Sequence, residues 1–203
     1  MRARRNRLAV THRHPSRFGQ HAFEPIWRAE RYLFGRQVPE EMAWWLFDPN
    51  SLTARLVDAC GGQFRVEVIS QAWQRPMLNE EQCLNMPVCH HALVRQVYLY
   101  CDDRPWVFAR TVIPRTTLSG EERQLAYLRD KPLGAVLFAE PTMRRSEVEV
   151  AEIHRGQRLY QTATATAGLN DKPASIWGRR SVFYLHDKPL LVSEIFLPDI
   201  PRA

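Results

Sequence analysis

Two strand-like runs joined by a tight turn constrain the fold of this chain more than any other feature. They lie in "HALVRQVYLYCDDRPWVFARTVIP", residues 91–114, and both runs are rich in β-branched and aromatic residues. Between them, "CDDRP" gathers residues that are typical of turns. Because strands joined by a tight turn pair antiparallel, this segment predicts a β-hairpin and an antiparallel sheet.

Three further segments extend this sheet. The alternation in "QFRVEVISQAWQRP", residues 63–76, predicts a strand. Residues 146–167, "SEVEVAEIHRGQRLYQTATATA", predict a second hairpin that turns at Arg155-Gly156. Residues 177–198, "WGRRSVFYLHDKPLLVSEIFLP", predict a third hairpin that turns at residues 186–188.

Helices are predicted in two places. The first pair comprises a short helix from about Pro39 and a helix that Ser51 caps and Gly61-Gly62 ends. The second place is "TLSGEERQLAYLRDKPLGAVLF", residues 117–138, which is helical with an interruption at Pro132. The order of elements predicts an α+β fold, with one antiparallel sheet of about six strands and helices on one side.

The net charge of +6 is concentrated at the N-terminus. Residues 1–36 hold nine Arg and two Glu, which gives +7, so the other 19 basic and 20 acidic side chains sum to −1. A nearly neutral body lacks the positive surface of a nucleic-acid-binding domain, and we expect no nucleic-acid partner. We interpret residues 1–38 as a basic, disordered extension that precedes one domain at residues 39–203. A nucleic-acid or membrane-surface arm and a transit peptide are alternative interpretations of the extension.

Apolar runs and cysteines bear on the compartment. No run approaches the ~18–20 apolar residues that span a bilayer, so we expect no stable membrane insertion and a cytoplasmic protein. The four cysteines include no C-x-x-C pair, and we expect them to be reduced thiols. "CLNMPVCHH", residues 83–91, has metal-ligand residue types, but its spacing fits no common zinc pattern, and we predict no metal site.

Charged residues inside apolar strands are the candidates for function. Glu194 lies within "KPLLVSEIFLP", and a charge in such a strand requires a partner or a ligand. Arg95, Arg110, Arg179 and Arg180 are embedded in the same way. Each is explained singly by a solvent-facing position or a structural Arg–Glu pair. As a set, they indicate a pocket for an anionic ligand, because the Arg fork binds carboxylates in a bidentate manner.

The motifs "ARTVIP", "PLGAVLF", "WGRRS" and "KPLLVSEIFLP" together resemble, in order and character, those of the bacterial chorismate pyruvate-lyase family. The match runs from about Pro39 to Pro198. The resemblance implies a six-stranded antiparallel sheet whose helices form flaps over a buried ligand site. It also implies a carbon–oxygen lyase that converts chorismate to 4-hydroxybenzoate and pyruvate without a cofactor, the first committed step of ubiquinone biosynthesis. We expect a monomer.

The resemblance also implies roles for individual residues. Arg95 matches the arginine that binds a substrate carboxylate, and Leu133 matches a leucine that contributes a backbone contact. Glu194 matches the glutamate that contacts the ring hydroxyl, with general-base catalysis as the rival role. Leu52 stands where the family commonly has Met in a flap, a swap that conserves volume. The segment 147–173 is longer than the family pattern.

A non-catalytic function is the alternative. Effector-binding domains of GntR-type regulators have a similar fold, but they normally follow a winged-helix DNA-binding domain. Only some 38 residues precede the predicted domain here, too few for such a module.

Overall fold

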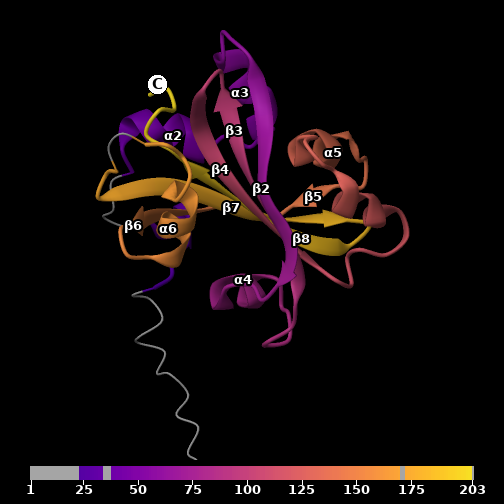
Figure 1. The fold of residues 1–203 in the computed structure, drawn as a ribbon. Helices are drawn as coiled ribbons and strands as arrows, with labels where there is room; N and C mark the ends of the chain where they lie inside the picture. The colour runs from indigo at the N-terminus through magenta and orange to yellow at the C-terminus, as the bar shows by residue number, and fades with distance from the viewer. Residues whose placement is uncertain (1–22, 34–37, 170–171, 203) are drawn as a thin grey trace, which may run out of the picture.

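The computed structural model describes residues 23–33, 38–169 and 172–202. They form one antiparallel sheet with the strand order β1-β6-β7-β8-β4-β3-β2, and β5 pairs with β7 (Figure 1). The strands are β1 (Arg28–Ala29), β2 (Phe64–Gln74), β3 (Ala92–Cys101), β4 (Arg104–Pro114), β5 (Arg144–Arg145), β6 (Glu149–His154), β7 (Ser175–Leu185) and β8 (Lys188–Phe196). The predicted α+β class is confirmed. The predicted count of six strands is wrong, because β1 and β5, of two residues each, join the six longer strands.

The first and third predicted hairpins are confirmed and form the centre of the sheet. β3 and β4 are joined by a turn that begins at Asp102, whose φ of 51° is one that Asp tolerates in turns. β7 and β8 are joined by His186 and Asp187, with φ values of 46° and 64°. Positive φ at both central residues is typical of the type I′ hairpin turn. Because β4 pairs with β8, the two hairpins form one continuous wall.

The helices are α2 (Glu40–Leu46), α3 (Leu52–Ala59), α4 (Leu78–Cys83), α5 (Leu133–Ala139) and α6 (Arg158–Thr164), with 3-10 helices η1 (Glu30–Tyr32) and η2 (Gly120–Tyr127). None of the described helices is long and apolar enough to cross a membrane. α2, α3, η2 and α5 pack on one face of the sheet. The predicted cap of α3 is confirmed, because the N–H of Ala54 donates to Ser51 Oγ at 3.4 Å.

Helices cover the second face as well, so the prediction of helices on one side is wrong. Tyr98, Phe108 and Ile195 point away from α3 and pack with Leu159 and Tyr160 of α6. α4 closes the same face beside them. The central strands β3 and β4 are buried at nearly every position, so both faces of the sheet require an apolar cover.

The segment predicted as the second hairpin contains only one strand. β6 pairs with β1 along one edge and with β7 along the other, so no free edge remains for a further strand. The chain turns at Gly156, as predicted, and then forms α6. The hydroxyl of Thr162 donates to the Arg158 carbonyl at 2.8 Å, a bond by which a threonine is accommodated within a helix.

Residues 23–33 belong to the folded body and not to the extension predicted for residues 1–38. β1 joins the sheet, and the carboxylate of Glu24 accepts the N–H groups of Leu78 and Asn79 at 3.1 and 3.0 Å. These bonds satisfy donors in the first turn of α4. The remainder of the predicted extension lies largely outside the described residues.

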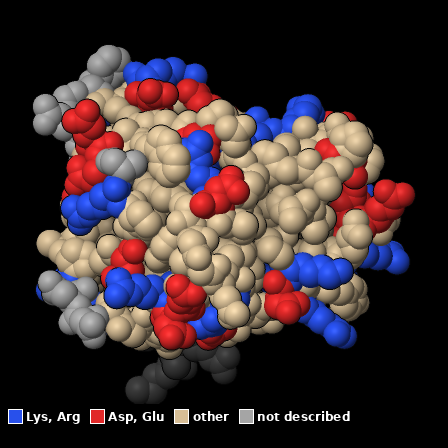
Figure 2. Space-filling view, turned by 90° about the horizontal axis from the view of Figure 1, so that it is seen from above, with Lys and Arg blue, Asp and Glu red and all other residues tan. Residues whose placement is uncertain are grey.

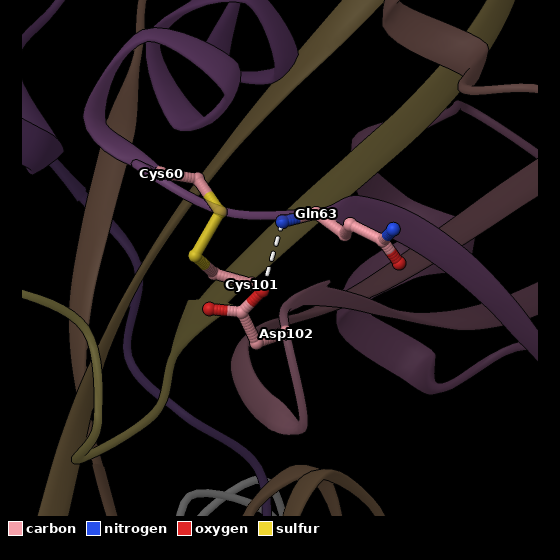
Figure 3. Close-up of a disulfide and its surroundings, with 4 residues drawn as sticks. All are labelled: Cys60, Gln63, Cys101 and Asp102. Carbon is pink, nitrogen blue, oxygen red and sulfur yellow. Dashed lines mark hydrogen bonds between the residues drawn. A yellow bond between two sulfur atoms is a disulfide. The ribbon is translucent and has the colours of Figure 1, made fainter.

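Two of the four cysteines form a disulfide, which corrects the expectation of reduced thiols. Cys60 and Cys101 are 41 residues apart and are bonded to each other (Figure 3). Cys83 and Cys89 are free. Cys101 pairs in register with Phe64, and Cys60 precedes Phe64 by one short loop. The proximity of the two sulfurs therefore depends on the register of β2 and β3, which cysteine spacing does not reveal.

Positive and negative side chains are mixed on the surface. On the face shown in Figure 2, Lys and Arg lie among Asp and Glu, with uncharged surface between them. The described part of this face carries no extended patch of one sign. This distribution agrees with the near-neutral charge of residues 37–203 and gives a polyanion no broad surface to bind there.

Candidate active site

A small, partly enclosed cavity lies between the sheet and helices α3 and α5. Its floor is formed by alternate residues of β3, β4 and β8, and its cover by the first residues of α3 and α5. The lining is mostly apolar. The free volume is about 50 Å³, far below the roughly 300 Å³ or more of typical small-molecule sites. A ligand with a substituted six-membered ring needs more room than this cavity offers.

The cavity brings together the four residues that the family resemblance pointed to. Arg95 of β3 and Glu194 of β8 lie in its floor, while Leu52 of α3 and Leu133 of α5 lie in its cover. β4 separates β3 from β8, so the arginine and the glutamate approach the cavity from different strands. Their roles toward a ligand stay predictions.

Arg95 is a buried cation without a carboxylate partner among the described residues. Its side chain is 2% exposed, and its two hydrogen bonds are long: 3.4 Å to Gln71 Oε1 and 3.3 Å to the Lys131 carbonyl oxygen. Burial lowers the pKa of Arg95, and the charge of Asp130 opposes this effect only in part. Since an arginine stays protonated in proteins, the cavity holds a positive charge that forms no ion pair with any residue the structure describes.

Glu194 has the partner that its place in an apolar strand required. Arg179 lies directly opposite on β7, and its Nε donates to Glu194 Oε2 at 2.6 Å. Arg179 is 1% exposed, whereas the Glu194 side chain is 18% exposed. Within the described part of the chain, Oε1 of Glu194 makes no hydrogen bond to another residue. One oxygen is therefore fixed by Arg179 and the other is available to accept a hydrogen bond from a ligand.

Arg179 also connects Glu194 to the base of the α3 cover. Its NH1 group donates to the carbonyl oxygens of Trp45 and Asp48 at 2.9 and 2.8 Å. Asp48 in turn forms an ion pair with Arg55 of α3. The guanidinium of Arg179 thus binds both Glu194 and the segment that precedes α3.

Arg110, Arg179 and Arg180 do not line the cavity, so the prediction that several arginines share one ligand pocket is wrong. Arg110 forms a bidentate pair with Glu80, at 2.7 and 2.9 Å, beneath α4. Arg180 pairs with Glu149 at 2.7 Å. Both face away from Arg95 and are structural Arg–Glu pairs, the other interpretation that the sequence allowed.

The two covering helices meet closely at Gly134. A Cβ at this position would lie 2.9 Å from Thr53 Oγ1, so only glycine lets α5 approach α3 without a shift. Gly134 follows Leu133 in the first turn of α5, where backbone N–H groups have no acceptor within the helix. Both residues line the cavity.

Sequence reasoning assigned no role to two polar groups at the site. Arg179 was noticed only as an embedded charge, although its register opposite Glu194 makes it the partner of that carboxylate. Thr111 of β4 is 4% exposed and lies beside Arg95 in the floor. Thr111 lies two residues after Ala109 in β4, so strand alternation places both side chains on the cavity face. This alternation was the signal that the sequence offered. No group of three or more His, Cys, Asp or Glu in the described residues is arranged to hold a metal.

Comparison with known proteins agrees with the motifs quoted above. Residues 26–202 match the family described as chorismate lyase. The chain belongs to the chorismate lyase family. The predicted enzyme class, a carbon–oxygen lyase of this family, is confirmed with it.

Relatives in this family match nearly their whole length. A protein of Nitrosomonas europaea is 37% identical over 81% of this chain and 91% of its own. A protein of Methylococcus capsulatus is 40% identical over 77% of this chain and 94% of its own, and one of Psychromonas ingrahamii is 41% identical over 87% and 92%. All three carry the name "probable chorismate pyruvate-lyase".

Solved structures with little sequence similarity share the fold. The C-terminal domain of PhnF aligns with a TM-score of 0.55 at 9% identity, over 74% of this chain and 90% of that domain. A GntR-family transcriptional regulator of Bacillus cereus aligns with a TM-score of 0.51 at 12% identity, over 70% and 96%. At these identities the likeness concerns the fold alone.

Proposed function

We propose that the protein is a chorismate pyruvate-lyase that forms 4-hydroxybenzoate and pyruvate without a cofactor. The observation that carries this proposal is the presence, in one small cavity, of an arginine that has no carboxylate partner among the described residues and a glutamate with one available oxygen. The arginine suits a carboxylate and the glutamate suits a hydroxyl. Chorismate and 4-hydroxybenzoate carry these two groups on opposite sides of one ring.

The placement of the two side chains favours the para isomer. Arg95 is on β3 and Glu194 on β8, with β4 between them. Two strand spacings place their backbones about 10 Å apart across the sheet, so the side chains converge on a ligand from its two ends. A hydroxyl next to the carboxylate would lie near Arg95 and would leave Glu194 without a ligand contact.

The reaction needs positioning more than it needs reactive side chains. The hydrogen on the hydroxyl-bearing ring carbon moves to the enolpyruvyl methylene while the ring carbon–oxygen ether bond breaks. The methylene becomes the methyl group of pyruvate, the ether oxygen becomes its ketone, and the ring becomes aromatic. Atoms and electrons balance within this six-membered array. Holding the enolpyruvyl arm over the ring supplies about 7–11 kcal/mol of such a barrier when the geometry is close to that of the reaction.

Three groups serve this geometry. Arg95 binds the ring carboxylate and stabilises negative charge as the ether bond breaks. The backbone N–H groups of Leu133 and Gly134 assist at the cover of the cavity. Glu194 accepts a hydrogen bond from the ring hydroxyl through Oε1, while Arg179 fixes Oε2. We assign Glu194 a positioning role rather than general-base catalysis, because the cyclic route needs no base.

The small size of the cavity makes product release the slow step in this proposal. Its free volume is too small for a ring with substituents, so α3 and α5 separate in each cycle. We infer a low turnover number and strong inhibition by 4-hydroxybenzoate. We also propose that the protein acts as a cytoplasmic monomer at the first committed step of ubiquinone biosynthesis.

The alternative is an effector-binding domain that does not catalyse a reaction. The fold of GntR-type regulators favours this alternative, since they resemble this chain in architecture. Such a domain binds its ligand in the same cavity and leaves it unchanged. The two functions therefore differ in turnover and not in affinity.

One experiment separates them. The purified, metal-free protein is incubated with chorismate, and pyruvate and aromatic products are separated by chromatography with ultraviolet detection. Equal amounts of pyruvate and 4-hydroxybenzoate support the lyase. Binding of 4-hydroxybenzoate without turnover supports the effector-binding domain, and 2-hydroxybenzoate or 3-hydroxybenzoate as the product contradicts the assigned pocket geometry.

A further inference from the structure

The disulfide joins the cover of the cavity to its floor. Cys60 directly follows α3, which places Leu52 and Thr53 over the cavity, and Cys101 ends β3, which carries Arg95 into the floor. Figure 3 shows the bond running from the end of the helix to the end of the strand. A covalent link therefore joins α3 in the cover to β3 in the floor, and the cavity lies between these two elements.

A two-glycine joint lies next to this link. Gly61 and Gly62 connect Cys60 to β2, and no atom lies within 4 Å of where a Cβ of Gly61 would be. Gly62 leaves room for the Asp102 carboxylate, which would lie 2.2 Å from a Cβ at this position. Chains are most free to rotate at glycine, so the joint is the natural hinge between α3 and the sheet.

The sheet beyond the joint is held without the disulfide. The N–H of Gln63 donates to Asp102 Oδ1 at 2.8 Å (Figure 3). In return, the N–H of Asp102 donates to the Gln63 carbonyl oxygen at 2.8 Å. Phe64 then pairs with Cys101 in the β2–β3 ladder. Breaking the disulfide thus leaves the strands in register and frees only the C-terminal end of α3.

We propose that Cys60–Cys101 is a redox-modification site that controls how readily α3 opens, so that a dithiol reductant accelerates ligand entry and release. A thiolate of the dithiol attacks one sulfur of the pair, the S–S bond breaks, and a mixed disulfide forms. The second thiol of the reductant closes on the first and releases the protein. Two electrons and two protons pass to the cysteines, and the reductant leaves as a cyclic disulfide. The nature of the ligand rests on the proposed function, but the motion of α3 does not.

The other two cysteines supply a matched control. Cys83 ends α4 on the opposite face of the sheet, and Cys89 is exposed in the loop after it. Neither contributes to the cavity. Cys60 and Cys101 are each 7% exposed, so reduction is verified by counting thiols before any comparison.

Hydrogen exchange of the ligand-free full chain, with and without dithiothreitol, tests directly whether the disulfide restrains α3. We expect amides of residues 52–60 to exchange about threefold faster or more after reduction, while those of β7 and β8 keep their rates. The Cys60→Ser, Cys101→Ser double variant should behave like the reduced protein and ignore dithiothreitol. The Cys83→Ser, Cys89→Ser double variant should respond as the native chain does.

Stopped-flow release of 4-hydroxybenzoate gives the functional readout. We expect its dissociation rate constant to rise about threefold or more on reduction. If the exchange rates in α3 do not change after verified reduction, the proposal that the disulfide restrains α3 is wrong. It is also wrong if exchange rises uniformly over the whole sheet, or if four thiols can be titrated in the oxidised protein. If α3 exchanges faster but 4-hydroxybenzoate does not bind, the restraint of α3 by the disulfide stands and the proposed ligand is wrong.

Discussion

At the scale of single residues, Arg95 and Arg110 lie on neighbouring strands and point to opposite faces of the sheet. Arg95 makes two long hydrogen bonds and has no carboxylate partner among the described residues, whereas Arg110 is paired with Glu80 in a buried bidentate contact. We expect Arg95→Met to weaken 4-hydroxybenzoate binding by roughly 10- to 150-fold, the value of about 1.5–3 kcal/mol for a hydrogen bond to a charged group. The melting temperature should stay unchanged or rise, because an uncompensated buried charge is removed.

Arg110→Met is the matched control for this prediction. It leaves Glu80 buried without its partner, so we expect the free energy of unfolding to fall by about 3–5 kcal/mol. Affinity for 4-hydroxybenzoate, measured by calorimetry on the folded fraction, should change little. If Arg95→Met destabilises the protein as much as Arg110→Met does, Arg95 is a structural residue and the anion site is wrong.

A candidate residue could be predicted from sequence where its unusual feature lies within its own strand. Glu194 and Arg95 stood out because each interrupts an apolar strand, and both line the cavity. Arg110 stood out for the same reason, yet its partner Glu80 comes from α4, whose place is set by packing between distant segments. The disulfide could not be predicted for the same reason, since the proximity of its two cysteines depends on how distant segments pair. Strand alternation reveals which charges are unusual, and only the tertiary fold decides which of them a ligand can reach.

At the scale of elements, the contact between α3 and α5 decides how tightly the cavity closes. A Cβ on residue 134 would lie 2.9 Å from Thr53 Oγ1, and the nearest other side-chain atom is Ser51 Oγ at 3.5 Å. We expect Gly134→Ala to hold the helices apart, to raise the dissociation rate of 4-hydroxybenzoate and to weaken its affinity by about 1–3 kcal/mol, the usual effect of overpacking. Stopped-flow fluorescence measures both quantities.

A double variant isolates this contact. Thr53→Ala removes the hydroxyl that the new methyl group would meet, so Gly134→Ala should do less harm in the Thr53→Ala background than in the native chain. Such non-additivity is expected only for residues in contact. Additive effects of the two changes would show that Gly134 acts through the backbone of α5 and not through its approach to α3.

The element assigned wrongly, residues 158–164, shows a second limit of sequence patterns. The alternation of Thr and Ala resembles a strand, but β1 already occupies the open edge of β6. β1 comes from residues 28–29, in a segment interpreted as an extension. Local propensity is a weak guide where a distant segment occupies the edge on which the strand would have to pair.

At the scale of the whole molecule, one buried carboxylate joins the η2 segment to the turn between β7 and β8. Glu122 is 4% exposed, accepts a hydrogen bond from Lys188 Nζ at 2.5 Å and lies 2.7 Å from His186 Nδ1. The hydrogen bond from Lys188 is the largest cause that lowers the pKa of Glu122 to about 2, and His186 adds to it. The same contact with Glu122 raises the pKa of His186.

These opposite pKa shifts define a pH window for the stability of the fold. Glu122 titrates near 4.5 when unfolded, so its contribution is complete above that pH and is lost as the pH falls toward about 2. His186 titrates near 6.5 when unfolded, so its contribution is complete below that pH and is lost as the pH rises through its raised folded pKa. The cluster should therefore stabilise the protein most between about pH 4.5 and 6.5.

Thermal unfolding of Glu122→Gln tests this window. The difference in melting temperature between the native chain and the variant should be largest near pH 5.5, and it should shrink toward both pH 3 and pH 9, which lie outside the interval between the unfolded pKa values of 4.5 and 6.5. Glu67→Gln is the control, since Glu67 pairs with Arg65 on the surface and is 47% exposed. Such a pair contributes little, so its variant should differ from the native chain by a small and nearly constant amount. A Glu122→Gln difference that does not vary with pH would mean that Glu122 stabilises the fold by packing, and that its charge does not hold η2 to the β7–β8 turn.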